Sequence, residues 1–140
     1  FAPSAAFYSL KFDQDRNILF VATPLLAVSK VTPGGKILWS SGTEPQGTGE
    51  KIDFSRPRDV AGDSRGNVWV IDSGKDEIYC LSSAGKFLMK YGRHESLDDT
   101  KGKGFDKPSG ICIAEVNGSV FLYVGDSGNQ RIVKYQILYH

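Results

Sequence analysis

The chain has 140 residues, of which 40% are hydrophobic and 24% are charged, and this composition is that of one globular domain rather than of a disordered segment. Its formal net charge of +1 gives no overall field that would recruit nucleic acid or an acidic membrane, so such a partner would have to use a local patch. The longest apolar runs, at residues 18–22 and 119–125, have the length of strands and exclude a membrane-spanning helix.

Internal repetition is the main signal along the chain. Residues 13–22, "DQDRNILFVA", align without a gap with residues 63–72, "DSRGNVWVID", and the match includes the Asp and Asn of the turns. A third copy begins at Lys107 and ends early, without a counterpart of the "GKFLMKYG" at residues 85–92. The sequence therefore predicts one segment, residues 1–140, with three repeats at about residues 6–42, 56–92 and 107–140.

Each copy consists of short segments rich in Val, Ile, Phe, Trp and Tyr between Gly, Asn, Asp and Ser, which predicts consecutive antiparallel strands joined by tight turns. In the second copy the expected strands are residues 59–63, 67–72, 77–82 and 86–91. The second of these strands is apolar on both faces, because Val68 points to one side and Trp69 to the other, so both faces need to be covered. Four-stranded sheets stacked face to face around an axis provide that cover, and we predict an all-β fold of the β-propeller class.

The repeat resembles a known family. Residues 56–92 resemble the NHL repeat in the Pro before the inner strand, the Gly-Asn turn, the Asp-Ser-Gly after the second strand and the Gly-Lys outer turn. Residues 107–135 are similar and contain the "NQRI" element at residues 129–132. The resemblance covers nearly the whole chain and implies a propeller of about six four-stranded blades, of which this chain forms about three. NHL propellers occur in RNA-binding TRIM-type proteins, in protein-interaction modules and in amidating lyases, so the resemblance implies a fold more narrowly than a function.

Two departures from the repeat concern its surfaces. The first copy has Pro24, Leu25 and Leu26 where the others have polar turn residues, which predicts an apolar patch. The third copy lacks its outermost strand, and residues 1–6 could supply such a strand to a neighbouring blade. We expect self-association or association with further propeller blades, because apolar side chains at both ends need cover. They are Leu10, Phe12, Ile18 and Phe20 at one end, and Ile111, Ile113, Val120, Leu122 and Val124 at the other.

Groups with catalytic potential are few. Asp72 and Asp126 recur with the repeat, which favours a structural role as acceptors of backbone hydrogen bonds within turns. Arg131 is expected to brace a neighbouring turn carboxylate by a forked pair. His94 and His140 are the only histidines, and neither stands at a metal-site spacing from a Cys, Asp or Glu. We therefore expect no catalytic residue, no metal and no cofactor.

The candidate binding site lies on one face. The longest polar connection, residues 90–108, joins an outer strand to the next inner strand, and in a propeller such connections share a face with the turns between second and third strands. That face is conventionally the one that binds ligands, and it collects eight candidate ligand-binding residues: Arg56, Arg58, Lys75, Arg93, His94, Lys101, Lys103 and Lys107. Glu95, Asp98 and Asp99 dilute this patch, and a solvated loop of mixed charge is the alternative interpretation.

Three functions are compatible with this pattern. The first is a non-enzymatic binding or scaffolding module that engages a protein or single-stranded RNA, with Lys and Arg on phosphates and aromatics such as Tyr91 stacking on bases. The second is a metal-dependent lyase or lactonase with its site in the central channel, because Asp59, Asp63 and Ser109 lie on or near the inner strands. The third is a secreted sugar-binding or scaffolding propeller, for which Asn117 in "NGS" is a sugar acceptor, although Asn-Gly between apolar strands favours a type I′ hairpin turn.

The sequence is compatible with more than one cellular compartment. The chain begins at Phe1, no signal or transit segment is visible, and a cytoplasmic location is favoured over a secreted one. Cys80 and Cys112 can pair in an oxidising compartment, but the burial preference of cysteine favours two buried free thiols.

Overall fold

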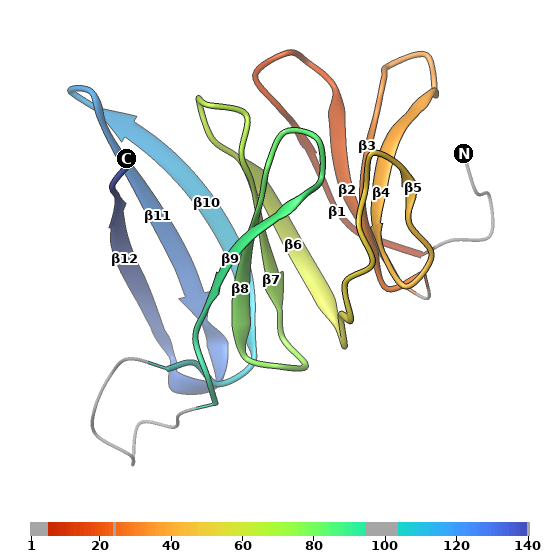
Figure 1. Ribbon diagram of the computed structural model, residues 1–140. Coiled ribbons are helices and arrows are strands. Elements are labelled where there is room, and N and C mark those ends of the chain that lie inside the picture. Colours follow the sequence, from red (N-terminus) through yellow and green to blue (C-terminus); the bar gives the residue numbers. More distant parts are fainter. Residues whose placement is uncertain (1–5, 24, 95–103, 140) are drawn as a thin grey trace.

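The computed structural model describes residues 6–23, 25–94 and 104–139, and it is all-β apart from one short 3-10 turn (Figure 1). Sheet 1 contains β1 (Ala6–Phe12), β2 (Ile18–Thr23), β3 (Ala27–Val31), β4 (Ile37–Gly42) and the two-residue β5 (Gln46–Gly47). Sheet 2 contains β6 (Pro57–Gly62), β7 (Val68–Asp72), β8 (Glu77–Leu81) and β9 (Phe87–Tyr91). Sheet 3 contains β10 (Pro108–Val116), β11 (Ser119–Asp126) and β12 (Arg131–Ile137), with the 3-10 turn η2 (Ser127–Asn129) before β12.

Every sheet is a meander, in which each strand pairs antiparallel with the next along the chain. The four strands expected in the second copy are confirmed as β6 to β9. All five residues of β7 are buried, which confirms that this strand is covered on both faces. No helix in the described part of the chain is long and apolar enough to cross a membrane.

The three sheets stack face to face in chain order, with sheet 2 in the middle (Figure 1). Between sheets 1 and 2 lies an apolar cluster that includes Leu19, Val21, Trp39, Val68 and Val70. Burying one large apolar side chain contributes about 1.5–3 kcal/mol, so these interfaces are the main source of stability. The inner strands β1, β6 and β10 are neighbours across the stack.

A second apolar cluster joins sheet 2 to sheet 3 and corrects one expectation. Ile111, Val120, Leu122 and Val124 were expected to need cover from another blade, yet none is more than 5% exposed. Most of this set packs with the partly buried Ile113 against a common face of sheet 2, formed by Ala61, Trp69, Ile71, Ile78 and Cys80. Because side chains alternate along a strand, the residues between these buried ones point to the outward face of sheet 3. They are Cys112, Phe121, Tyr123, Ile132 and Lys134.

The outward face of sheet 1 agrees with the expectation only in part. Leu10 and Phe12 are 61% and 71% exposed. Phe20 is only 8% exposed and packs with Ala22 and Val31 in a third apolar cluster, so this residue does not need cover. The outer strand expected from residues 1–6 falls mostly outside the described residues, and Ala6 itself belongs to the inner strand β1.

The identities between repeats are explained by turn chemistry. Asp63 Oδ1 accepts the backbone N–H of Arg65 and of Asn67, each at 2.9 Å, and Asp13 makes the same pair of bonds in sheet 1. The Asn117-Gly118 turn between β10 and β11 has φ values of 51° and 79°, which confirms the type I′ hairpin.

The two cysteines are free and have different environments. Cys80 is 4% exposed between sheets 2 and 3, whereas Cys112 is exposed on the outward face of sheet 3, so only one of the two expected buried thiols is observed. Burial first, and the charge of Asp63 second, raise the pKa of Cys80 to about 12. A thiol needs to ionise and to be reached in order to react with an electrophile.

We expect an aromatic disulfide reagent at neutral pH to modify one thiol in the folded chain and both thiols after unfolding, because only Cys112 is accessible. The released chromophore measures the number of modified thiols. Cys112→Ser should leave the folded chain unreactive, and rapid modification of Cys80 in that variant would contradict the assigned packing.

Candidate functional site

The candidate site is on the face that we call the connection face, where β7, β9 and β11 end and β6, β8, β10 and β12 begin. The antiparallel topology brings all the predicted basic residues within the described chain to this face. Lys101 and Lys103 lie outside the described residues.

Two buried aspartates organise the turns of this face. Asp72 accepts the backbone N–H groups of Ser55, Arg56 and Gly74 at 2.7, 2.8 and 3.0 Å. The carboxylate is fully buried, so these bonds replace its hydration. The structural role that the sequence predicts for Asp72 is thus confirmed.

Asp126 has the equivalent role in sheet 3. It accepts the backbone N–H of Asp106 at 2.7 Å and the Nε–H of Arg131 at 2.9 Å. The second contact of Arg131 goes from Nη2 to the carbonyl of Gly104 at 2.8 Å. Arg131 therefore braces the turn carboxylate as expected, although its second bond goes to a backbone carbonyl and does not form a fork on Asp126.

Three of the predicted basic residues line one cavity between sheets 2 and 3, which we call the basic cleft. Its volume is about 120 Å³, and it is lined by Arg56, Arg58, Ser73, Lys107, Pro108 and Ser109. Arg56 and Ser73 are linked through the backbone, because the Arg56 carbonyl accepts the N–H of Ser73 at 3.0 Å. Arg and Lys side chains are the usual partners of anionic groups, so this lining makes the basic cleft a candidate site for an anionic ligand.

The other predicted residues lie elsewhere on the connection face. Lys75 donates to the Asp53 carbonyl, and its Nζ lies 3.4 Å from the Asp53 carboxylate, whose negative charge partly offsets that of the lysine. Arg93 is exposed, and its carbonyl accepts the N–H of Phe105 at 2.8 Å. Neither side chain lines the basic cleft.

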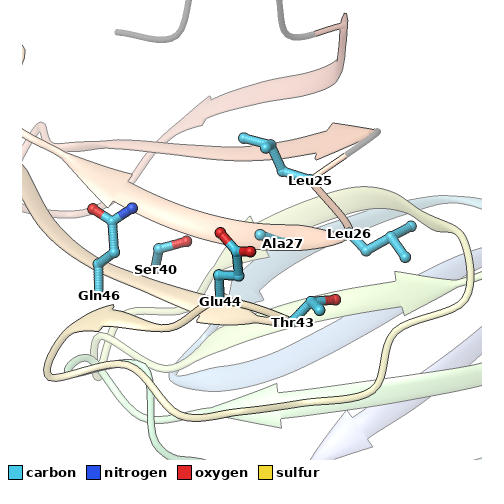
Figure 2. A pocket seen from close by; sticks show the side chains of 7 residues that line it. All are labelled: Leu25, Leu26, Ala27, Ser40, Thr43, Glu44 and Gln46. Atoms are coloured by element: carbon cyan, nitrogen blue, oxygen red, sulfur yellow. The ribbon is translucent and has the colours of Figure 1, made fainter.

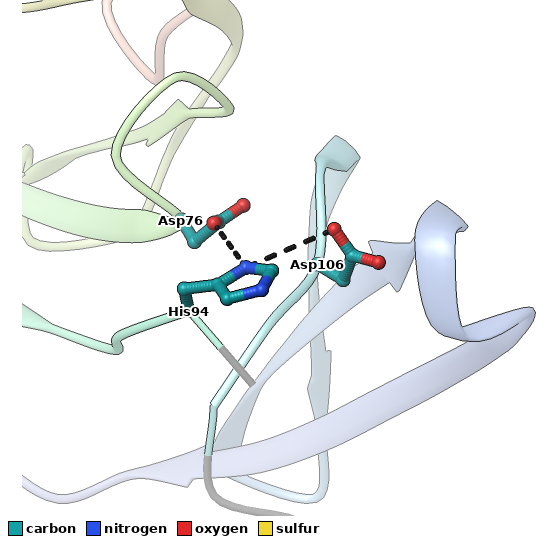
Figure 3. A group of neighbouring side chains, drawn as sticks. All are labelled: Asp76, His94 and Asp106. Carbon is teal, nitrogen blue, oxygen red and sulfur yellow. Dashed lines mark hydrogen bonds and ion pairs between the residues drawn. The ribbon is translucent and has the colours of Figure 1, made fainter. Parts of the chain in front are cut away.

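His94 belongs to a separate cluster with two carboxylates (Figure 3). Its Nδ1 lies 2.9 Å from Asp76 Oδ2 and 3.9 Å from Asp106 Oδ1. The three potential ligand atoms all lie within 4.8 Å of one another. The sequence pattern missed this cluster because its members are far apart in the chain. The pairing of β8 with β9 brings Asp76 and His94 together, and the approach to β10 adds Asp106.

The two carboxylates that the channel-enzyme hypothesis names, Asp59 and Asp63, both have structural contacts. Asp59 accepts from Ser9 Oγ, from Lys11 Nζ at 2.9 Å and from the backbone N–H of Ile111 at 2.8 Å, so it joins three inner strands. Asp63 Oδ2 accepts from Trp69 Nε1 at 3.0 Å and from the Tyr139 hydroxyl at 2.8 Å.

Ser109, the third residue of the channel hypothesis, shares a hydrogen bond with the hydroxyl of Ser127. It lies in the lining of the basic cleft. Its hydroxyl is therefore part of the connection face, together with the basic residues.

The predicted apolar patch of the first copy is of mixed polarity. Leu25 is 50% exposed, whereas Leu26 packs against the core between sheets 1 and 2, and Pro24 lies outside the described residues. The two leucines help to form a hollow of about 250 Å³ that Figure 2 shows. The remaining lining residues are Ala27, Ser40, Thr43, Glu44 and Gln46.

No family model matches the sequence, and no curated protein matches it either. Solved structures do resemble it. A protein of unknown function from Bacteroides thetaiotaomicron has a TM-score of 0.67 at 21% identity over 91% of this chain and 34% of its own. A chain of the nidogen/laminin complex has a TM-score of 0.61 at 19% identity over 96% of this chain and 49% of its own. Virginiamycin B lyase from Staphylococcus aureus has a TM-score of 0.59 at 14% identity over 96% of this chain and 42% of its own.

The chain thus spans less than half the length of each of these structures. At such identities the likeness concerns the fold alone, and the fold is shared by a lyase and by a chain of the nidogen/laminin complex. Together with the stack of antiparallel sheets, it shows that this chain is part of a β-propeller in which sheets 1, 2 and 3 are successive blades.

Proposed function

We propose that this chain is a non-enzymatic binding module, a propeller segment of NHL type that engages its partner through the connection face. The observation that carries the proposal is the basic cleft, where Arg56, Arg58 and Lys107 converge with two serines around one cavity. The structural bonds of Asp59 and Asp63 favour this function over a channel enzyme, because each carboxylate is already engaged by several donors.

The chemistry of the cleft fits a partner that carries regularly spaced anionic groups. Arg and Lys side chains position phosphates through charge-assisted hydrogen bonds, and hydroxyl groups add donors without charge. Single-stranded RNA offers such phosphates, and an acidic protein segment offers carboxylates. Tyr91, the aromatic residue expected to stack on a base, is 40% exposed and makes edge contacts to Phe105 and Tyr135.

We expect a labelled single-stranded RNA to bind the chain at low salt and to dissociate steeply as salt rises, because binding releases counterions from the phosphates. Arg56→Ala and Lys107→Ala should each weaken binding and lower the logarithmic salt slope by about 1. A filter-binding series at several salt concentrations measures both quantities. The double variant Lys101→Ala with Lys103→Ala should also weaken RNA binding, which tests the connection between β9 and β10.

Lys36→Ala is the matched control, since it removes the same charge from an exposed position on the opposite face, in the β3–β4 turn. It should leave the affinity unchanged. If the chain does not bind RNA at low salt, the RNA version is wrong and an acidic protein segment remains. If Lys36→Ala weakens binding as much as Lys107→Ala, the basic cleft is not the site.

A further inference from the structure

We propose that Asp76, His94 and Asp106 form a zinc site that ties sheet 2 to sheet 3 on the connection face. The site shares no residue with the lining of the basic cleft, although Lys107 of that lining directly follows Asp106, and it goes beyond the proposed function. Figure 3 shows the His94 ring with its Nδ1 edge turned toward both carboxylates.

The distances suit a tetrahedral ion. Zn–N and Zn–O bonds of about 2.1 Å place neighbouring ligand atoms about 3.4 Å apart. The two measured separations from His94 Nδ1, 2.9 Å to Asp76 and 3.9 Å to Asp106, lie on either side of that value. Shifts of about half an ångström would bring each carboxylate to ligand distance from Nδ1, and the two carboxylate ligand atoms lie within 4.8 Å of each other, so side-chain torsions can close the site.

The charges of the cluster are not balanced. Two carboxylates face one imidazole, so even a protonated His94 supplies one positive charge against two negative ones. Asp76 Oδ1 accepts the backbone N–H of Lys107 at 2.7 Å. For the Asp106 carboxylate the described residues provide no hydrogen-bond donor, and its nearest partner is His94 Nδ1 at 3.9 Å, although the side chain is only 24% exposed. A divalent cation would neutralise both carboxylates at once.

The backbone around the ligands is fixed by contacts that do not involve the ligand atoms. The N–H of Asp106 is held by the fully buried Asp126, and the N–H of Phe105 by the carbonyl of Arg93. The segments of His94 and Asp106 are therefore already side by side, and binding would order few additional groups. A site with one imidazole and two carboxylates matches zinc better than calcium or magnesium, which prefer all-oxygen sites.

The remaining coordination position faces water. The His94 side chain is 64% exposed, while Asp76 and Asp106 are 13% and 24% exposed. Three protein ligands with one open position therefore leave room for a bound water or for a donor atom of a partner. Without an ion, the same residues would form a simple His94–Asp76 ion pair, and the experiment separates these two states.

Isothermal titration of the 140-residue chain with zinc chloride tests the proposal. We expect one zinc ion per chain. Asp106→Asn keeps the shape of the side chain but removes its charge, and His94→Ala removes the nitrogen ligand, so each should weaken zinc affinity by at least about tenfold. Cobalt should give the visible absorption of a tetrahedral site in the original chain and not in these variants.

The chain offers two matched controls, the other histidine and the accessible thiol. His140→Ala and Cys112→Ser should both keep zinc affinity. Circular dichroism without metal checks that the variants fold. If Asp106→Asn does not fold, the zinc affinity of His94→Ala decides the test. The proposal is overturned if the chain does not bind zinc, if His94→Ala binds it unchanged, or if a control variant abolishes binding. RNA binding is measured without zinc, so that the test of the zinc site and the test of the basic cleft can fail independently.

Discussion

Replacing Asp72 with alanine is expected to lower the free energy of unfolding by about 3–5 kcal/mol, because three backbone donors lose their acceptor in a buried turn. The Asp72 carboxylate is fully buried and accepts from Ser55, Arg56 and Gly74, two of which belong to the connection that leads into sheet 2. Water cannot readily replace a fully buried acceptor, so each N–H group would keep most of its desolvation cost.

Chemical denaturation followed by tryptophan fluorescence measures this change. Asp53→Ala is the matched control, because Asp53 lies in the same connection but its side chain is 98% exposed and only pairs with Lys75. It should change stability by no more than about 0.5 kcal/mol. A loss below about 1 kcal/mol for Asp72→Ala would mean that the turn rearranges to satisfy its donors in another way.

The second large effect that we expect is self-association of the chain. The mass measured in solution should be twice that of one chain. Both ends of the stack expose apolar side chains: Leu10 and Phe12 are 61% and 71% exposed on sheet 1, and Ile132 is 77% exposed on sheet 3. We propose a dimer with a two-fold axis, in which sheet 1 of each copy covers sheet 3 of the other. The dimer therefore has two equivalent interfaces. Such a pair of three-blade arcs would close one ring.

Light scattering coupled to size exclusion at micromolar concentrations measures the mass. Ile132→Glu should return the chain to a monomer, because it places an unpaired charge in the proposed interface. Leu88→Glu is the matched control, since Leu88 is 53% exposed on β9 rather than on an outward sheet face. A stable monomer of the original chain at these concentrations would show that the arc tolerates its bare faces, and the half-ring arrangement would be wrong.

Much of the fold can be predicted from local chemistry. The strands of sheet 2 follow from alternating apolar residues between turn formers, and the doubly apolar β7 requires cover on both faces. Asp72 and Asp126 could be assigned structural roles because a repeated residue serves the repeated scaffold, and their hydrogen bonds confirm this.

The remaining features depend on how the sheets pack. Alternation along β11 shows that Leu122 and Tyr123 point to opposite faces, but not which face meets sheet 2, and for that reason the outward set was assigned wrongly. The error for Cys112 has the same origin. The cluster of Asp76, His94 and Asp106 is likewise invisible in the sequence, because its ligand atoms meet only when β8 pairs with β9 and the segment before sheet 3 packs beside them.

The hydrogen bonds of Asp59 affect how the molecule unfolds. In a linear array of repeats that contact only their neighbours, the end repeats can melt one at a time. Here one carboxylate, with its side chain 15% exposed, is bound by Lys11 from sheet 1 and by the backbone of Ile111 from sheet 3 while it belongs to sheet 2. If either outer sheet detaches, Asp59 loses a donor that water replaces poorly, and this loss raises the free energy of the partly opened intermediate. The first and third blades are thereby coupled through the second, and the arc should lose its structure in a single cooperative step rather than fray from its ends.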